Sequence, residues 1–203
     1  MKVLFFSDIH SDWRALERLV SVEADYYVCA GDLVSWARGL NRGGEILKQR
    51  AGQVFVIPGN HERDRDVAEF CESYGFTDLH GRSVQLGSAH LAALGYSNVT
   101  PFDTPGEFSE DELSSRLEAF AGLRRLVLFC HCPPYNTKLD AGRGGRHFGS
   151  AASGRVMDRV LPRYFFGGHI HEAEGVETRL GPGGETIGVN VGKKGYLLDW
   201  DLV

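Results

Sequence analysis

The chain has 203 residues, of which 42% are hydrophobic and 24% are charged, and its formal net charge is −5. Length and composition predict one globular domain over residues 1–203, with a core large enough to need no stabilising disulfides. The acidic balance argues against strong nucleic-acid binding, because that binding needs many Lys and Arg side chains to neutralise phosphates.

The apolar stretches of the sequence are short. None approaches the roughly 20 apolar residues that a membrane-spanning helix needs. The opening apolar run is too short for a signal peptide, and Asp8 follows it almost at once. Cys29 and Cys130 lie inside apolar runs, where thiols usually pack as small hydrophobic side chains. We therefore expect a cytoplasmic protein without membrane contact, whose cysteines are structural.

The first third of the chain alternates strand and helix patterns. Three apolar runs predict buried strands, at residues 2–7, 25–30 and 53–57. Helical patterns follow them at residues 13–20, 45–50 and 67–74. The second of these helices comes after a Gly-rich stretch, and Gly75 is placed to cap the third. This order of elements indicates an α/β layer structure.

The rest of the chain is richer in strands. Strand patterns occupy residues 83–96 and 125–130, and four further short candidates follow from residue 163 onwards. Ser109 and Glu112 form a capping box that predicts the start of one helix, and residues 150–161 suit another. Residues 136–149, between these elements, are irregular and rich in Gly and Arg.

Polar side chains of metal-binding types stand directly after five of the predicted strands. They are Asp8 and His10, Asp32, Asn60 and His61, His131, and His169 and His171. Binding sites in α/β sheets gather at the carboxyl ends of strands, so we expect these side chains to meet. Histidine and carboxylate ligands together suit manganese, iron, zinc or nickel, whereas magnesium prefers an oxygen shell. If the backbone stays extended, Asp8 and His10 point to the same side.

These side chains belong to ordered motifs with adjoining glycines. The motifs are Ser7-Asp8-Ile9-His10, Gly31-Asp32, Gly59-Asn60-His61-Glu62, His131 and Gly168-His169-Ile170-His171. Their order and spacing resemble the signature of the calcineurin-like metallophosphoesterase superfamily, over residues 8 to 171. The resemblance implies an α/β (α+β) fold, a four-layer αββα sandwich of two mixed sheets flanked by helices.

The resemblance also implies a role for each motif residue. A first divalent ion would be bound by Asp8, His10 and His171. A second would be bound by Asn60, His131 and His169, and Asp32 would bridge the two. The catalytic residues would be His61 and Asn60. His61 would bind no metal and would contact the phosphate or protonate the leaving oxygen.

The implied activity is hydrolysis of phosphodiesters or phosphomonoesters of small molecules or nucleotides, by a hydroxide that bridges two metal ions. Manganese is the first expectation for both ions, with iron, zinc and nickel as alternatives. The compact size and the segment His131-Cys132-Pro133-Pro134 resemble the small prokaryote-type phosphoesterases of this superfamily.

Two other functions stay open. Glu62-Arg63 resembles the Ser/Thr protein phosphatases, but Ser35 and Trp36 stand where that branch has Asp and Arg. A catalytically silent binding scaffold of the same fold would lack several catalytic positions, whereas this chain keeps all of them.

Three histidines lie outside the ordered motifs, and one of them, His147, adjoins Arg146. Arg146 and His147, in the irregular loop, are candidates for contact with the substrate, and the competing interpretation is a solvated surface loop. For His80 and His90 we expect ordinary structural roles.

Overall fold

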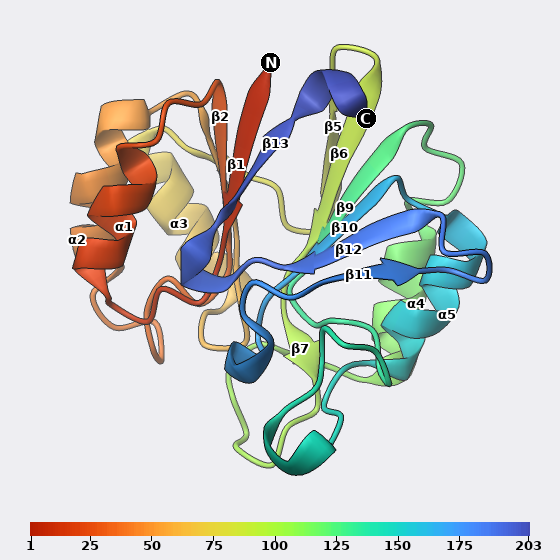
Figure 1. The fold of residues 1–203 in the computed structure, drawn as a ribbon. Helices are drawn as coiled ribbons and strands as arrows, with labels where there is room; N and C mark the ends of the chain where they lie inside the picture. The colour runs from red at the N-terminus through yellow and green to blue at the C-terminus, as the bar shows by residue number, and fades with distance from the viewer.

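The computed structural model describes residues 1–203 as two β-sheets packed face to face, with helices on both outer faces (Figure 1). The first sheet has the strand order β13-β1-β2-β3-β4. Its strands are β1 (Lys2–Phe6), β2 (Tyr26–Ala30), β3 (Val54–Ile57), β4 (Thr77–Asp78) and β13 (Tyr196–Asp199). The strands β1 to β4 run parallel and β13 runs antiparallel to β1, so this sheet is mixed.

The second sheet has the strand order β11-β12-β10-β9-β6-β5. Its strands are β5 (Arg82–Leu86), β6 (Ala89–Leu94), β9 (Leu126–Cys130), β10 (Tyr164–Gly167), β11 (Glu177–Leu180) and β12 (Thr186–Asn190). The four inner strands are parallel and both edge strands are antiparallel, so this sheet is mixed as well. Two short strands, β7 (Ser97–Asn98) and β8 (Glu107–Phe108), pair separately.

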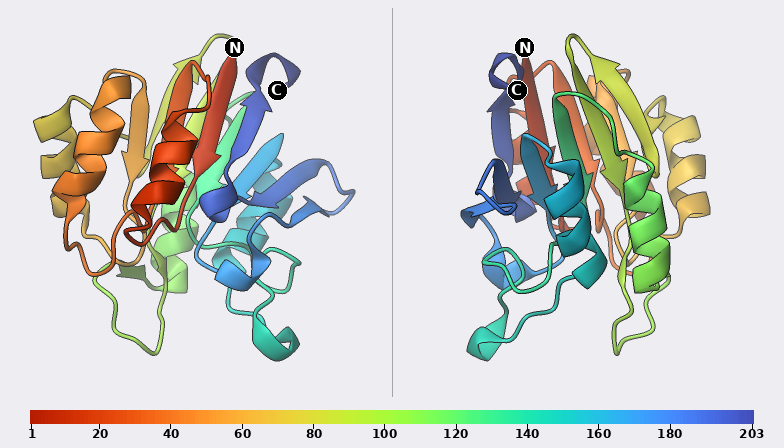
Figure 2. Two further views of the ribbon diagram at one scale, coloured as in Figure 1. Left: turned by 60° about the vertical axis from the view of Figure 1, so that its left-hand side comes forward. Right: turned by 90° about the vertical axis from the view of Figure 1, so that its right-hand side faces the viewer.

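Five α-helices cover the outer faces of the two sheets (Figure 2). They are α1 (Trp13–Val20), α2 (Leu40–Leu47), α3 (Asp64–Tyr74), α4 (Glu110–Glu118) and α5 (Ala151–Val160). The first three pack on the first sheet, and α4 and α5 pack on the second. Short 3₁₀ turns complete the chain: η1 (Lys48–Arg50), η2 (Arg143–Gly145), η3 (His171–Ala173), η4 (Gly192–Lys194) and η5 (Trp200–Leu202).

The apolar strands are buried on both faces, which explains their nearly continuous hydrophobic sequences. In β1, Val3 and Phe5 point into the core between the sheets, whereas Leu4 and Phe6 pack under the helices. The rings of Phe5 and Phe166 stack across the two sheets with centroids 4.2 Å apart. This arrangement confirms the predicted four-layer sandwich of two mixed sheets flanked by helices.

The predicted start of the second helix is wrong. The sequence pattern predicts that the second helix begins at residue 45, but α2 begins at Leu40 and contains Gly43 and Gly44. A Cβ atom on Gly43 would lie 2.7 Å from the side chain of Leu33, and one on Gly44 would lie 2.4 Å from the ring of Tyr74. Close packing, which the local sequence does not reveal, therefore explains these helical glycines.

Other predicted signals are confirmed by the structure. Gly75 follows α3 in the left-handed conformation, with φ of 71°, and the capping box of Ser109 and Glu112 begins α4. No helix of the structure combines the length and the apolar character that crossing a membrane requires.

Candidate metal centre

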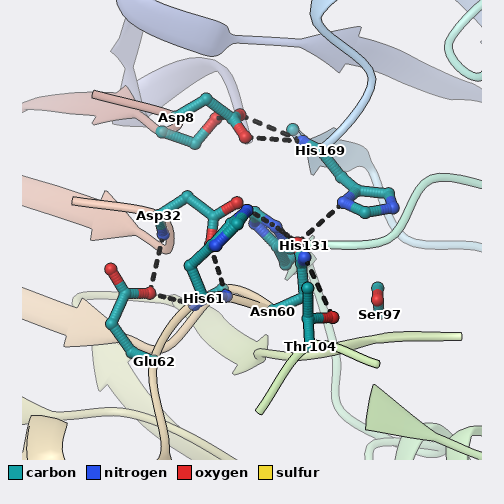
Figure 3. Close-up of polar contacts among 12 residues, drawn as sticks. Asp8, Asp32, Asn60, His61, Glu62, Ser97, Thr104, His131 and His169 are labelled. Atoms are coloured by element: carbon teal, nitrogen blue, oxygen red, sulfur yellow. Dashed lines mark hydrogen bonds and ion pairs between the residues drawn. The ribbon is translucent and has the colours of Figure 1, made fainter. Parts of the chain in front are cut away.

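The predicted polar residues meet at one end of the sandwich, where parallel strands of both sheets end. Figure 3 labels Asp8, Asp32, Asn60, His61, His131 and His169 among them. The backbone there is not extended, contrary to the expectation for Asp8 and His10. Asp8, His10, Asp32 and His169 all have positive φ, of 54°, 45°, 52° and 66°. Such conformations are uncommon for residues other than glycine and cluster at functional sites. The sharp turns bring residues that follow different strands into one cluster.

Asp8, His10 and His171 form the first group of donor atoms, all within 4.8 Å of one another. The Nε2 atom of His171 lies 3.6 Å from a carboxylate oxygen of Asp8 and 3.1 Å from Nε2 of His10. The other ring nitrogen of His10 lies 3.0 Å from the hydroxyl of Ser35. This contact orients the His10 ring so that Nε2 faces the group.

Asp32, His131 and His169 form a second group of donor atoms within 4.8 Å of one another. The side-chain oxygen of Asn60 lies 2.9 Å from Nδ1 of His169 and 3.3 Å from Nε2 of His131. The Asn60 amide donates to the hydroxyl of Thr104 at 3.2 Å, which directs its oxygen towards the histidines. Nδ1 of His131 lies 3.1 Å from the carbonyl of Ala30, so donation there leaves Nε2 free to bind.

Asp32 lies between the two groups. One of its carboxylate oxygens is 3.5 Å from Nε2 of His10 and 3.5 Å from Nε2 of His131. A carboxylate in this position has donor atoms for two neighbouring cations. Asp8 is fixed separately, by the backbone amide of His169 at 3.0 Å and by the hydroxyl of Ser7.

The donor set fits divalent metal ions. It combines carboxylate oxygens, an amide oxygen and imidazole nitrogens, which suit borderline cations such as manganese, iron and zinc. Two glycines allow the backbone to pass close to the carboxylates of this donor set. A Cβ atom would lie 2.0 Å from the Asp32 carboxylate if placed on Gly59, and 2.3 Å from the Asp8 carboxylate if placed on Gly168. The backbone therefore approaches the carboxylates at distances that only glycine permits.

The charges of the cluster shift several pKa values. Burial opposes the ionisation of Asp8, but a hydrogen bond from His171 and the charge of His131 hold the pKa of this carboxyl well below its usual range. Burial also opposes protonation of His131, but Asp32 and Asp8 outweigh it and raise the pKa to about 9. Burial and the charge of His131 lower the pKa of His169 to about 4. The imidazole of His169 is therefore neutral at pH 7, as a metal ligand must be.

His61 borders both groups. Its backbone amide donates to the Asp32 carboxylate at 2.9 Å, and its ring lies edge-on to those of His10 and Trp36, with centroids 5.1 and 5.5 Å away. Its Nδ1 atom is buried and has no hydrogen-bond partner. A ring nitrogen of His61 also lies within 4.8 Å of donor atoms of His10 and Asp32. The ring can therefore reach a group bound at the centre.

Sequence reasoning missed two positioning residues, Glu62 and Asn190. Glu62 is buried, and its carboxylate accepts the backbone amides of Asp32, Gly59 and Val34 at 2.8 to 3.0 Å. The amide of Asn190 donates to the carbonyls of Gly168 and Ile170, in the loop that carries His169 and His171. The motif that contains Glu62 was a usable signal, whereas Asn190 stands in no motif.

Arg146 and His147, the two candidates for substrate contact, occupy different environments in the structure. His147 lines a cavity together with His169, and its Nδ1 lies 2.7 Å from the buried carboxylate of Asp140. Arg146 is exposed, and its guanidinium lies over the ring of Phe148 at 5.9 Å. The structure therefore brings His147 to the centre's edge and leaves Arg146 outside the cavity.

Comparisons with known proteins agree with this geometry. The family model described as calcineurin-like phosphoesterase matches residues 1–173, which confirms the resemblance of the ordered motifs. An uncharacterised protein of Methanocaldococcus jannaschii is 27% identical, over 98% of this chain and 91% of that protein.

Two solved structures are similar in fold. For the phosphopantetheinyl hydrolase of Mycobacterium tuberculosis the TM-score is 0.68 at 14% identity, covering 94% of this chain and 88% of that one. For a dimetal phosphatase of Danio rerio the TM-score is 0.63 at 12% identity, covering 95% and 88%. At these identities the likeness establishes the fold alone.

Proposed function

Because the chain belongs to the calcineurin-like phosphoesterase family, we propose that it hydrolyses phosphodiesters or phosphomonoesters of small molecules or nucleotides with the help of two divalent metal ions. The observation that carries the proposal is the meeting of two donor groups that share Asp32 as a neighbour. The two solved proteins of similar fold, a phosphopantetheinyl hydrolase and a dimetal phosphatase, support the same class of activity.

Each donor group would hold one ion. Asp8, His10 and His171 would bind the first, and Asn60, His131 and His169 the second, with Asp32 shared between them. Manganese is our first choice, and iron, zinc or nickel suit the same donors. When bound, two such ions neutralise phosphate charge and lower the pKa of water.

The chain's own contribution to bond cleavage is assigned to His61. The departing oxygen of an ester is a poor leaving group unless it receives a proton. The His61 ring is tethered to Asp32 through its backbone and has an unpartnered buried nitrogen. We assign it the role of proton donor to the leaving oxygen, with Asn60 next to it at the second metal position.

A pair of variants tests the proposal. Asp32→Ala should lose both ions and the hydrolysis of aryl phosphates, because the shared ligand is gone. His61→Ala should keep the ions and lose roughly 10²- to 10⁴-fold in rate, the usual contribution of a general acid. Metal content is measured by elemental analysis in both variants. Turnover is measured with 4-nitrophenyl esters for Asp32→Ala, and with an alkyl phosphate ester, whose alkoxide leaving group needs the proton, for His61→Ala. Asp111→Ala, an exposed carboxylate on α4, is the control. Two ions retained in Asp32→Ala would contradict the shared-ligand assignment.

Two rival functions make different predictions. A Ser/Thr protein phosphatase should prefer phosphopeptides to small aryl phosphates, yet Ser35 and Trp36 supply no charged group for the peptide phosphate. Instead, Ser35 orients His10 and Trp36 packs against His61. A silent scaffold should bind metal and hydrolyse no phosphoester. Assays of phosphopeptides, nucleotides, cyclic nucleotides and aryl esters on one metal-loaded preparation separate the three functions.

A cytoplasmic location is part of the proposal. The four cysteines are free and buried, as expected in a reducing compartment, and they lie at Cys29, Cys71, Cys130 and Cys132. Fractionation of the source cells, with immunodetection of the chain, tests this location.

A further inference from the structure

An apolar cavity of about 480 Å³ opens beside His169, at the edge of the candidate metal centre. Most of its wall comes from two loops, one between β7 and β8 and one between β9 and α5, and the remainder from His169 and Ile170, which follow β10. Both loops project from the end of the sandwich at which the metal centre lies (Figures 1 and 2). The cavity has the size of a small-ligand site and is continuous with the proposed catalytic centre through His169.

The large side chains that line this cavity are unusually exposed. Val99 and Phe102, on the first loop, are 70% and 73% exposed, and Tyr135 and Phe148, on the second, are 53% and 46% exposed. Exposed apolar side chains gathered at one place mark a binding surface more often than scattered ones do. None of these four belongs to the hydrophobic core clusters.

The polar side chains of the cavity are largely satisfied within the protein. The Thr100 hydroxyl donates to Glu107, and the Asn98 amide donates to the carbonyl of Gly149 at 3.4 Å. Asp140 engages one nitrogen of His147, so the second nitrogen of that ring is left for a ligand. A group with many hydroxyls would lose its water here without gaining partners, whereas an aromatic group would not.

The cavity and His61 lie on different sides of the centre. His169 faces His131 and lines the cavity, whereas His61 faces His10 and Trp36 and does not line it. A leaving group that takes its proton from His61 must lie on the His61 side. A group in the cavity is therefore attached to an oxygen that stays on phosphorus.

We infer that this cavity binds the aromatic, non-leaving ester group of a phosphodiester. The protein is then a diesterase that retains the substrate's aromatic ester group and cleaves the other ester bond. The inference rests on the proposed function. In the reaction, the oxygen of water forms a bond to phosphorus and the bond from phosphorus to the leaving oxygen breaks. His61 gives its proton to that oxygen, the attacking water releases a proton to solvent, and His61 is then reprotonated from solvent. The products are an alcohol and an aromatic phosphomonoester.

A matched pair of substrates tests the inference. Phenyl 4-nitrophenyl phosphate and methyl 4-nitrophenyl phosphate share one leaving group and differ only in the retained group. With the manganese-loaded protein, we expect kcat/KM to be about tenfold higher or more for the phenyl ester, as burial of a ring predicts. In Phe102→Ser and Phe148→Ser, both exposed positions, the ratio should fall towards one. Leu202→Ser removes a comparably exposed apolar side chain elsewhere and should keep the wild-type ratio.

A binding measurement gives a second readout that does not depend on turnover. Phenyl phosphate, the product with the retained ring, should bind more tightly than methyl phosphate in calorimetric titrations, and Phe148→Ser should remove the difference. Equal kcat/KM for the two esters, or a preference that survives both Phe variants, would overturn the inference and leave the proposed hydrolase intact. If neither diester is hydrolysed but 4-nitrophenyl phosphate is, the inference fails and the proposed hydrolase stands. If 4-nitrophenyl phosphate is not hydrolysed either, the proposed function fails, and the inference, which rests on it, fails with it.

Discussion

The Glu62 carboxylate holds the backbone of Asp32, the residue that lies between the two donor groups. One Glu62 oxygen accepts the Asp32 amide at 2.9 Å and the Gly59 amide at 2.8 Å, and the other accepts the Val34 amide at 3.0 Å. Burial and the nearby Asp32 raise the pKa of Glu62 to about 8, while the three amides oppose that rise. Glu62 thus fixes two loops that carry metal-binding residues without entering the centre itself.

Glu62→Gln should weaken metal binding about 10- to 100-fold, the usual cost of disturbing a group that orients ligands. The new amide nitrogen cannot accept a hydrogen bond from the backbone, so the variant should also lose about 1–3 kcal/mol of stability. Metal titration of the folded variant and urea unfolding measure the two effects. Glu69→Gln, an exposed change on α3, is the control. A variant that is less stable but keeps the wild-type metal affinity would make Glu62 purely structural.

Gly168→Ala should damage the first donor group, because the added methyl would lie 2.3 Å from the Asp8 carboxylate and 2.3 Å from the Ser7 hydroxyl. We expect loss of the metal ion assigned to Asp8 and destabilisation of about 1–3 kcal/mol, as for other overpacked sites. Elemental analysis and thermal unfolding check the two outcomes.

Gly154→Ala is the matched control for this change. Gly154 lies inside α5, with no heavy atom within 4 Å of the place where its Cβ would stand. Alanine there should raise stability by about 0.4–1 kcal/mol and leave the metal content unchanged. Equal metal loss in both glycine variants would show that the clash with Asp8 is not the cause.

Much of the fold and the meeting of the metal-binding residues follow from the sequence. The buried strands are continuous apolar runs, and each polar motif directly follows one, so their convergence at a sheet edge could be predicted. The backbone conformation of the turn that carries Asp8 and His10 could not be predicted. Asp8 and His10 adopt left-handed backbone conformations, which are uncommon for residues other than glycine, and backbone hydrogen bonds to Gly31 and Asp32 hold them there.

Features built from distant segments escaped prediction for a physical reason. Asn190 supports the loop of His169 from another strand, and no local pattern encodes that contact. The apolar cavity joins Phe102 with Phe148 from two different loops. Each of these rings alone looks like an isolated surface aromatic, and only the folded chain shows that they face the same space.

Metal uptake should release protons near neutral pH. In the metal-free protein Asp32 and Asp8 raise the pKa of His131 to about 9, so this ring is protonated at pH 7. A ligand must be deprotonated, so binding at pH 7 expels about one proton, and metal affinity rises up to about tenfold per pH unit towards pH 9. Calorimetric manganese titrations between pH 6.5 and 8.5, in two buffers with different ionisation enthalpies, count the protons. In Asp32→Asn the release should shrink, and an affinity independent of pH would contradict the assignment of His131.

His80, which belongs to none of the metal-binding motifs, should make the fold sensitive to mild acid. Burial lowers its pKa to about 4, and its neutral ring accepts the Gly95 amide at 3.1 Å and packs against Tyr96 and Phe108. In the unfolded chain the His80 ring becomes protonated as the pH falls through about 6.5. In the folded chain it stays neutral until the pH falls to about 4. Stability from this group is therefore complete above pH 6.5 and falls as the pH drops towards 4.

His80→Asn keeps an acceptor for the Gly95 amide and removes the titration. Between pH 7 and pH 5 the metal-free wild type should lose up to about 2 kcal/mol more unfolding free energy than this variant, since one pKa unit corresponds to about 1.4 kcal/mol. Urea unfolding of both proteins at the two pH values measures the difference. Because the aspartates and histidines of the metal centre are the same in both proteins, their titration cancels in the comparison. Parallel pH profiles would show that the folded chain protonates His80 as readily as the unfolded chain does.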